Sequence, residues 1–121
     1  MYVAHELGRR GVAFICAREA LAPVKSASGN GPALESRDWI GPKLRAAFGG
    51  VYIANEGFTS ESAAAVVAAG DADAVAFGKA FIANPDLPRR LKAGLPLNAP
   101  RQELFYASGP EGYTDYPTIE G

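Results

Sequence analysis

Sulfur and imidazole ligands are scarce in this sequence, which contains one cysteine, Cys16, and one histidine, His5. A single cysteine cannot form an intramolecular disulfide, and one cysteine with one histidine is too few for a metal-ligand cluster. We therefore expect no metal site. Cys16 lies in an apolar run without a positively charged neighbour to activate it, so we expect a small core residue rather than a nucleophile.

An excess of charge is also missing, because 12 Lys and Arg residues face 13 Asp and Glu residues, for a net charge of −1. Binding to a nucleic-acid backbone requires clustered positive charge, so nucleic acid is not an expected partner. The longest apolar runs reach about half of the roughly 20 residues that cross a bilayer, and the N-terminus lacks a signal-peptide pattern. We expect a soluble, cytoplasmic protein without a membrane partner.

The 121 residues are enough for one hydrophobic core and too few for two. Residues 2–11 predict a helix, since Arg9, Arg10 and Gly11 are typical of a helix C-terminus. No capping residue precedes this helix. The sequence thus has the features of a chain that begins inside a helix, as if an upstream part had been cut away.

A pattern of strand, loop and helix then occurs three times. Continuous apolar runs at 12–16 and 51–54 predict strands buried on both faces, and a third short strand is predicted within 71–78. The composition of 20–32 is that of a loop. Helices are predicted near 39–48, from Thr59 or Ser60 to about Gly70, and from Asn84 to Gly94. Helices between successive strands require crossovers, so the expected fold is α/β with a parallel sheet and right-handed connections.

The regular pattern ends at Leu95. Residues 95–121 contain four prolines and no sustained helical or strand period. This tail is nevertheless aromatic, whereas disordered segments are poor in aromatic residues, so we expect it to pack against another surface. Its aromatic residues are Phe105, Tyr106, Tyr113 and Tyr116.

Glycine-bearing turns follow the second and third predicted strands. Asn55, Glu56 and Gly57 come after one strand, and Gly78 and Lys79 come after the next. The carboxyl ends of parallel strands carry the binding sites of α/β proteins, and helix N-termini there offer unpaired amides to a phosphate. Glycine permits close approach of the backbone, and lysine supplies a positive charge.

A less specific interpretation is open for the same residues. Tight turns after strands need glycine in any case, and one Gly-Lys pair is no phosphate-loop motif. Lys79 taken alone is typical of a solvated surface lysine. Arg18 and Glu19 follow the first strand, where they could contact a ligand or form an exposed pair.

Several segments, in the same order and spacing, resemble one known family. GGVYIANEGFT is followed by ADAVAFGKAFIANPDL and then by PLN, FY and GYTDYP. Together they are similar to the C-terminal part of the old yellow enzymes, the flavin-dependent alkene reductases that include N-ethylmaleimide reductase-type enzymes. The resemblance extends from Gly11 to about Thr118.

The resemblance implies a fold, cofactors and a reaction. The family fold is a TIM (β/α)8 barrel that holds FMN at the carboxyl ends of its strands, and the strands here would be about the sixth to the eighth. The whole chain, 1–121, would then be a partial FMN-binding α/β barrel with 95–121 as an irregular tail. Family members reduce FMN with NADPH or NADH and then pass a hydride to a small electrophilic alkene.

The resemblance also implies roles for individual residues. Asn55, Glu56, Gly57, Gly78 and Lys79 would bind the FMN phosphate. Phe105 would lie beside the flavin, and Tyr106 would contribute to the substrate pocket. Tyr113 and Tyr116 match the GYTDYP motif, and we interpret them as packing residues that hold the tail in place.

Two features depart from the family pattern. Many family members have arginine where this chain has Lys79, and lysine loses the bidentate geometry of arginine. A barrel of this type also needs about 250 residues. The family's proton-donating tyrosine and its substrate-binding His/Asn or His/His pair belong to earlier strands, so we expect no catalytic residue in this chain.

These observations leave three hypotheses. The first is the FMN-binding portion of an alkene reductase, which would need the missing N-terminal barrel portion or self-association to cover its open strand edges. The second is another FMN- or phosphate-binding barrel enzyme, since many activities share this fold. The third is a half-barrel that acts as a binding or assembly module without catalysis.

Overall fold

The computed structural model describes residues 1–19 and 39–120, so the predicted loop at 20–32 lies outside the described residues. Contacts divide the chain into two compact units, Met1–Ala76 and Phe77–Gly121. The single partial barrel with a tail from residue 95 remains a prediction. No helix in the described parts of the chain is long and apolar enough to cross a membrane.

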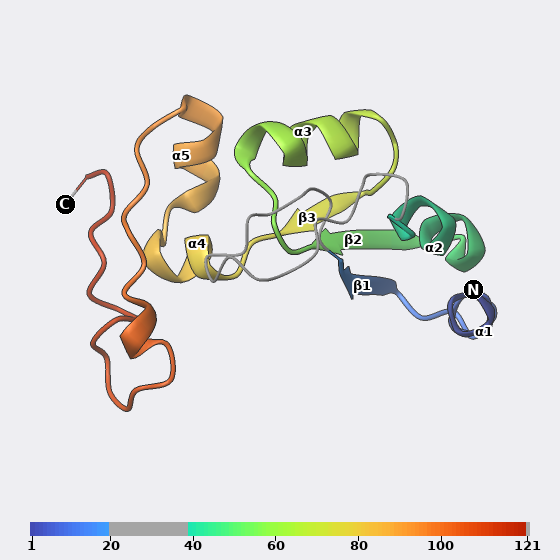
Figure 1. The fold of residues 1–121 in the computed structure, drawn as a ribbon, viewed down its shortest axis with the longest axis horizontal. Helices are drawn as coiled ribbons and strands as arrows, with labels where there is room; N and C mark the ends of the chain where they lie inside the picture. The colour runs from blue at the N-terminus through green and yellow to red at the C-terminus, as the bar shows by residue number, and fades with distance from the viewer. Residues whose placement is uncertain (20–38, 121) are drawn as a thin grey trace. The chain divides into compact units, whose positions relative to one another are not determined.

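The first unit is built around a three-stranded parallel sheet in the order β1-β2-β3 (Figure 1). The strands are β1 (Phe14–Arg18), β2 (Val51–Asn55) and β3 (Ala74–Ala76). Its helices are α1 (Tyr2–Arg9), α2 (Gly41–Phe48) and α3 (Ser60–Ala68). The predicted α/β class and the parallel sheet are therefore confirmed.

β1 begins two residues later than the apolar run predicts. The amide of Val12 donates a hydrogen bond to the carbonyl of Leu7, and the amide of Gly11 donates to that of Gly8. Gly11 has a φ of 70°, the left-handed conformation that glycine adopts readily at a helix end. Val12 therefore belongs to the exit from α1, and the strand starts only at Phe14.

The helix boundaries in this unit follow local chemistry. Thr59 caps α3 by accepting a hydrogen bond from the amide of Ser62, whose side chain bonds back to Thr59, so the first of the two predicted capping positions is correct. Gly49, with a φ of 72°, ends α2 as the sequence predicts. Trp39 and Ile40 precede α2 instead of forming part of it.

Only one face of the sheet is buried. Tyr52 and Ala54 are 0% and 1% exposed and form the core with Val66 of α3 and with Ala72. On the opposite face Phe14 and Val51, which are register partners, are 54% and 47% exposed. The prediction of strands buried on both faces is therefore wrong for this chain, because its described helices cover one face alone.

Cys16 corrects another expectation, since it is exposed and not a core residue. It lies on β1 two residues from Phe14 and pairs in register with Ile53. Side chains alternate between the two faces of a strand, so Cys16 shares the uncovered face with Phe14. An apolar run identified the strand without identifying which face would be covered.

The second unit contains α4 (Lys79–Ala83), α5 (Leu87–Ala93) and the short 3-10 helix η2 (Gln102–Leu104). The sequence pattern did not predict α4 as a separate helix. Asp86 stands before α5, but its side chain does not cap the helix. Gly94 ends α5 with a φ of 62°, as predicted.

An ion pair joins α2 to the sheet. Arg45 donates to both carboxylate oxygens of Asp73 at 3.0 and 2.7 Å, and the amide of Tyr52 donates to Asp73 at 2.9 Å. The hydrogen bond from Arg45, followed by the one from the Tyr52 amide, lowers the pKa of Asp73 to about 2. One carboxylate therefore connects a helix, a strand and the turn before β3.

The lowered pKa of Asp73 predicts that this carboxylate makes the stability of the fold sensitive to acid. Its pKa is lower in the folded chain than the ordinary 3.8, so its stabilising effect is complete above 3.8 and is lost as pH falls toward 2. We expect Asp73→Asn to be less stable than the unmodified chain at pH 7. Its stability should decline less between pH 4 and pH 2. Urea unfolding across this range measures the difference, and equal declines for both proteins would contradict the assignment.

Candidate functional site

The turn after β2 has an unusual backbone conformation. Asn55, the last residue of β2, pairs in register with Arg18 of β1 and Ala76 of β3. Glu56 and Gly57 follow with φ values of 88° and 78°. Glycine adopts such values at little cost, whereas glutamate is strained there. This turn lies at the carboxyl end of the sheet, where the sequence places it.

An ion pair brings β1 to the same turn. The Arg18 guanidinium donates from Nε and Nη2 to the two carboxylate oxygens of Glu56, at 3.3 and 3.2 Å. Arg18 is therefore beside the predicted phosphate turn. The Glu19 carboxylate accepts a hydrogen bond from the amide of Ile40 at 2.7 Å.

Sequence reasoning missed the Arg18–Glu56 contact, although a signal was present. In a parallel pair of adjacent strands, the residues at the two carboxyl ends lie side by side. Aligning the two predicted strands at their carboxyl ends would have placed Arg18 next to Asn55 and Glu56. The strand boundaries in the sequence pattern were too uncertain to establish that register.

The second predicted turn belongs to the unit that starts at Phe77. Gly78 immediately precedes α4, without a side-chain cap, and a Cβ atom placed there would meet nothing within 4 Å. Lys79 is the first residue of α4 and is exposed. α4 has only five residues, so its dipole contributes little to binding a phosphate. The features that suit a phosphate are the open backbone at Gly78 and the charge of Lys79.

The two aromatic candidates lie in the same unit as Lys79. Phe105 follows η2 and is half-buried, and its carbonyl accepts a hydrogen bond from the Tyr113 hydroxyl. Tyr106 is 99% exposed, so its ring is available to a ligand or to another chain. Tyr116 is 8% exposed, which agrees with a packing role, whereas Tyr113 is 44% exposed.

The structure therefore gathers the candidates into two groups. One group, within Met1–Ala76, contains Asn55, Glu56 and Gly57 together with Arg18. The other, within Phe77–Gly121, contains the remaining candidates: Gly78, Lys79, Phe105 and Tyr106. A single phosphate site formed by both turns remains a prediction.

The residues present fit a flavin phosphate in part. Gly57 adopts a left-handed conformation, the unobstructed Gly78 leaves its backbone open to a close ligand, and Lys79 supplies a charge. The Glu56 carboxylate would repel a phosphate, so only its backbone suits this role. Arg18 offsets that negative charge. Among the described residues, no group of acidic, histidine and cysteine side chains suits a metal ion.

Comparison with known proteins identifies the family. A sequence model of the NADH:flavin oxidoreductase / NADH oxidase family matches residues 2–98. The chain belongs to this family. Putative 12-oxophytodienoate reductase 12 of Oryza sativa subsp. japonica is 40% identical over 123 residues, which cover 98% of the chain. 12-Oxophytodienoate reductase 2 of Arabidopsis thaliana is 49% identical over 78 residues, 64% of the chain.

Solved structures agree with this assignment. Morphinone reductase matches with a TM-score of 0.82 at 37% identity, covering 99% of the chain and 30% of that structure. The old yellow enzyme homologue from Zymomonas mobilis matches with a TM-score of 0.81 at 36% identity, covering 96% and 31%. Morphinone reductase has also been solved in complex with tetrahydroNAD. The predicted relationship to the old yellow enzymes is confirmed.

The chain spans less than a third of the length of these relatives. The chain spans 21% of the Arabidopsis reductase and 30% of the rice reductase. The described strands therefore correspond to a part of an old yellow enzyme fold. Their assignment as the sixth to eighth strands remains a prediction.

The strained turn predicts a stabilising substitution. Glu56→Gly removes the cost of a positive φ at a non-glycine residue, about 1–2 kcal/mol, and loses an exposed ion pair worth about 0–1 kcal/mol. We expect a net gain of about 1 kcal/mol in the free energy of unfolding, measured by urea denaturation. Glu56→Gln is the control, because it removes the ion pair and keeps the strain. A Glu56→Gly variant no more stable than Glu56→Gln would contradict the strained conformation.

Proposed function

We propose that the chain is the FMN-binding portion of an NAD(P)H-dependent oxidoreductase that reduces activated alkenes. One observation carries the proposal. Glycine-bearing backbone, including the left-handed Gly57 and the open Gly78, follows two consecutive parallel strands in a chain of the flavin oxidoreductase family. This is the place where parallel α/β folds bind phosphate.

Each candidate residue has a distinct role in this proposal. The backbone at Asn55, Glu56, Gly57 and Gly78 approaches the phosphate closely, and the Lys79 ammonium neutralises part of its charge. Phe105 packs beside the flavin ring, and Tyr106 forms part of the substrate pocket. When bound, FMN would supply the hydride transfer from NADPH or NADH to an electrophilic alkene. The tetrahydroNAD complex of morphinone reductase supports a nicotinamide donor for this chain.

The proposal includes a partner that completes the sheet. β1 and β3 each pair with β2 alone, so each has an edge without a partner strand among the described residues. The apolar face with Phe14 and Val51 is also uncovered. Further barrel strands, from an N-terminal portion or from another copy of the chain, would pair with the open strand edges and cover the apolar face. The strands here then correspond to about the sixth to the eighth of the barrel, in a cytoplasmic protein.

Titration with FMN tests the phosphate assignment, with riboflavin as the ligand that lacks the phosphate. Lys79→Ala should weaken FMN binding at least tenfold, because a charge-assisted hydrogen bond contributes about 1.5–3 kcal/mol. Riboflavin binding should not change. Lys79→Arg should bind FMN at least as tightly as the unmodified chain. Flavin fluorescence gives the affinities, for the chain alone and with the missing barrel portion supplied.

Lys92→Ala is the matched control, since it removes another exposed lysine, from the last turn of α5. Equal losses for the two alanine variants would contradict a specific role for Lys79. A completed barrel that leaves FMN unbound would overturn the proposed function. A folded dimer without flavin would favour the assembly module instead. NADPH oxidation driven by a maleimide or an α,β-unsaturated ketone distinguishes an alkene reductase from other FMN enzymes.

A further inference from the structure

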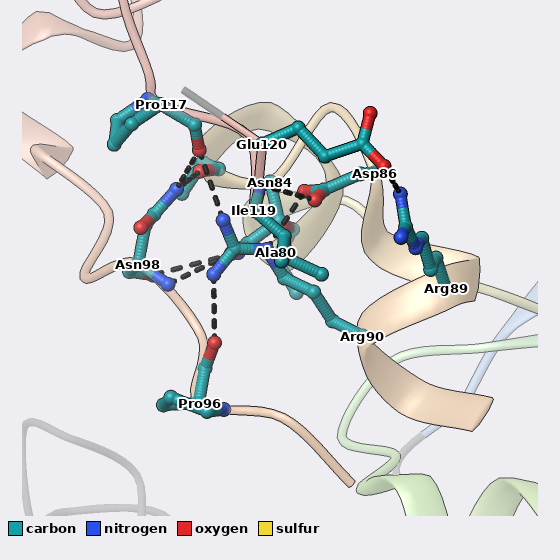
Figure 2. A network of polar contacts seen from close by, with 11 residues as sticks. Ala80, Asn84, Asp86, Arg89, Arg90, Pro96, Asn98, Pro117, Ile119 and Glu120 are labelled. Carbon is teal, nitrogen blue, oxygen red and sulfur yellow. Dashed lines mark hydrogen bonds and ion pairs between the residues drawn. The ribbon is translucent and has the colours of Figure 1, made fainter. Parts of the chain in front are cut away.

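Arg90 is a buried cation on α5, and each of its three guanidinium nitrogens donates a hydrogen bond. Its side chain is 7% exposed. Nε donates to the Asp86 carboxylate at 2.7 Å, Nη1 to the carbonyl of Pro96 at 2.7 Å, and Nη2 to the carbonyl of Pro117 at 2.9 Å. Figure 2 shows the guanidinium between these groups. One side chain thus joins α5 to two chain segments that are 21 residues apart in sequence.

Asn84 and Asn98 connect the same segments. Asn84 is completely buried, and its side-chain oxygen accepts a hydrogen bond from the Asn98 amide at 2.7 Å. The Asn98 side chain in turn donates to the carbonyls of Ala83 and Pro117, both at 2.8 Å (Figure 2). The chain entering the segment 99–116 is therefore hydrogen-bonded directly to the chain leaving it.

Asp86 completes the arrangement from the other side. Its second oxygen accepts the amide of Ile119 at 2.9 Å. Burial opposes its ionisation, but the hydrogen bonds from Arg90 and the Ile119 amide outweigh that effect and keep the pKa of Asp86 below its usual value. Asp86 therefore holds Arg90 in place and fixes the exit segment at the same time.

We call residues 99–116 the tail loop. Inside it, the Arg101 amide donates to the Tyr116 hydroxyl at 2.7 Å, and the Arg101 guanidinium lies 4.7 Å from the centre of the Tyr116 ring. Arg101 also pairs with Asp115, which accepts the Gly112 amide at 2.8 Å. These contacts tie the loop internally, so its position depends on how its base is attached.

The neighbouring arginine on α5 provides a contrast. Arg89 pairs with Glu120 through side chains that are 58% and 73% exposed. An exposed pair of this kind contributes little to structure. Arg90, by contrast, satisfies two carbonyls from separate segments, and the fixed fork of a guanidinium suits this better than the point charge of a lysine ammonium.

We propose that Arg90 is a positioning residue: it closes the base of the tail loop through Pro96 and Pro117, and thereby places Phe105 and Tyr106 for the flavin and its substrate. The placement of the aromatic pair rests on the proposed function. The closure itself rests on the hydrogen bonds of the second unit alone. Arg90 acts through the backbone of the loop and does not itself contact the cofactor.

Amide hydrogen exchange on the flavin-free chain tests the closure. Arg90→Met keeps the bulk of the side chain and removes its donors. We expect exchange at the amides of Asn98, Arg101 and Ile119 to accelerate about tenfold or more, while exchange at Tyr52 in β2 stays unchanged. Arg89→Met, the matched control, should leave all four amides unchanged. Arg90→Lys should accelerate the same three amides, because one ammonium cannot replace the fork.

Several outcomes would overturn the closure. One is that the three amides exchange at the same rates in Arg90→Met as in Arg89→Met. Another is that the Tyr52 amide accelerates as much as these three amides in Arg90→Met, because this would indicate general destabilisation. If Arg90→Met does not fold, Arg90→Lys decides the question by the same comparison. Unchanged exchange in Arg90→Lys would also refute the requirement for a guanidinium.

Flavin binding then tests the placement separately. Arg90→Lys should weaken FMN and riboflavin by the same factor, about tenfold, because the aromatic pair lies on the ring side of the flavin. Loss of FMN affinity alone would overturn the placement. Unchanged affinity for both ligands, with accelerated exchange, would overturn it as well. A chain that binds neither ligand, even with the missing barrel portion supplied, would refute the proposed function while leaving the exchange result as the test of the closure.

Discussion

Parallel pairing of β2 with β1 and β3 is the constraint on which the first unit depends. It aligns the last residues of the three strands, Arg18, Asn55 and Ala76, in one register. The segments that leave the strands therefore start from the same edge of the sheet. The Arg18–Glu56 ion pair follows from that alignment. The Asp73 carboxylate reinforces it by bonding to the β2 backbone and to α2.

The sequence was sufficient for the elements whose signals are local. Glycines marked the ends of α2 and α5, Thr59 marked the start of α3, and apolar runs marked the strands. Coverage of a strand is a property of its neighbours, which explains why Cys16 and Phe14 were expected inside and are exposed. The prediction that the first strand starts at Val12 was wrong for a related reason. An apolar residue at this position suits both the end of a helix and the start of a strand.

Some residues of the candidate site could likewise be identified from the sequence, and others could not. Glycine, a lysine and an aromatic pair could be selected from the sequence because their chemistry is evident without coordinates. The Arg18–Glu56 pair required the register, and the polar network around Arg90 required the path of the tail. A buried arginine bonded to carbonyl groups leaves no periodic signal, and its neighbour Arg89 looks the same in the sequence while lying at the surface.

The uncovered face of the sheet gives the chain a built-in reporter of its own assembly. Its sole thiol, Cys16, lies on that face and is accessible. Alkylation of this thiol by a small reagent such as iodoacetamide will slow when another surface covers the strands, and the reaction needs no added label. The residue that was expected to be hidden thus becomes a chemical probe for any surface that covers this face of the sheet.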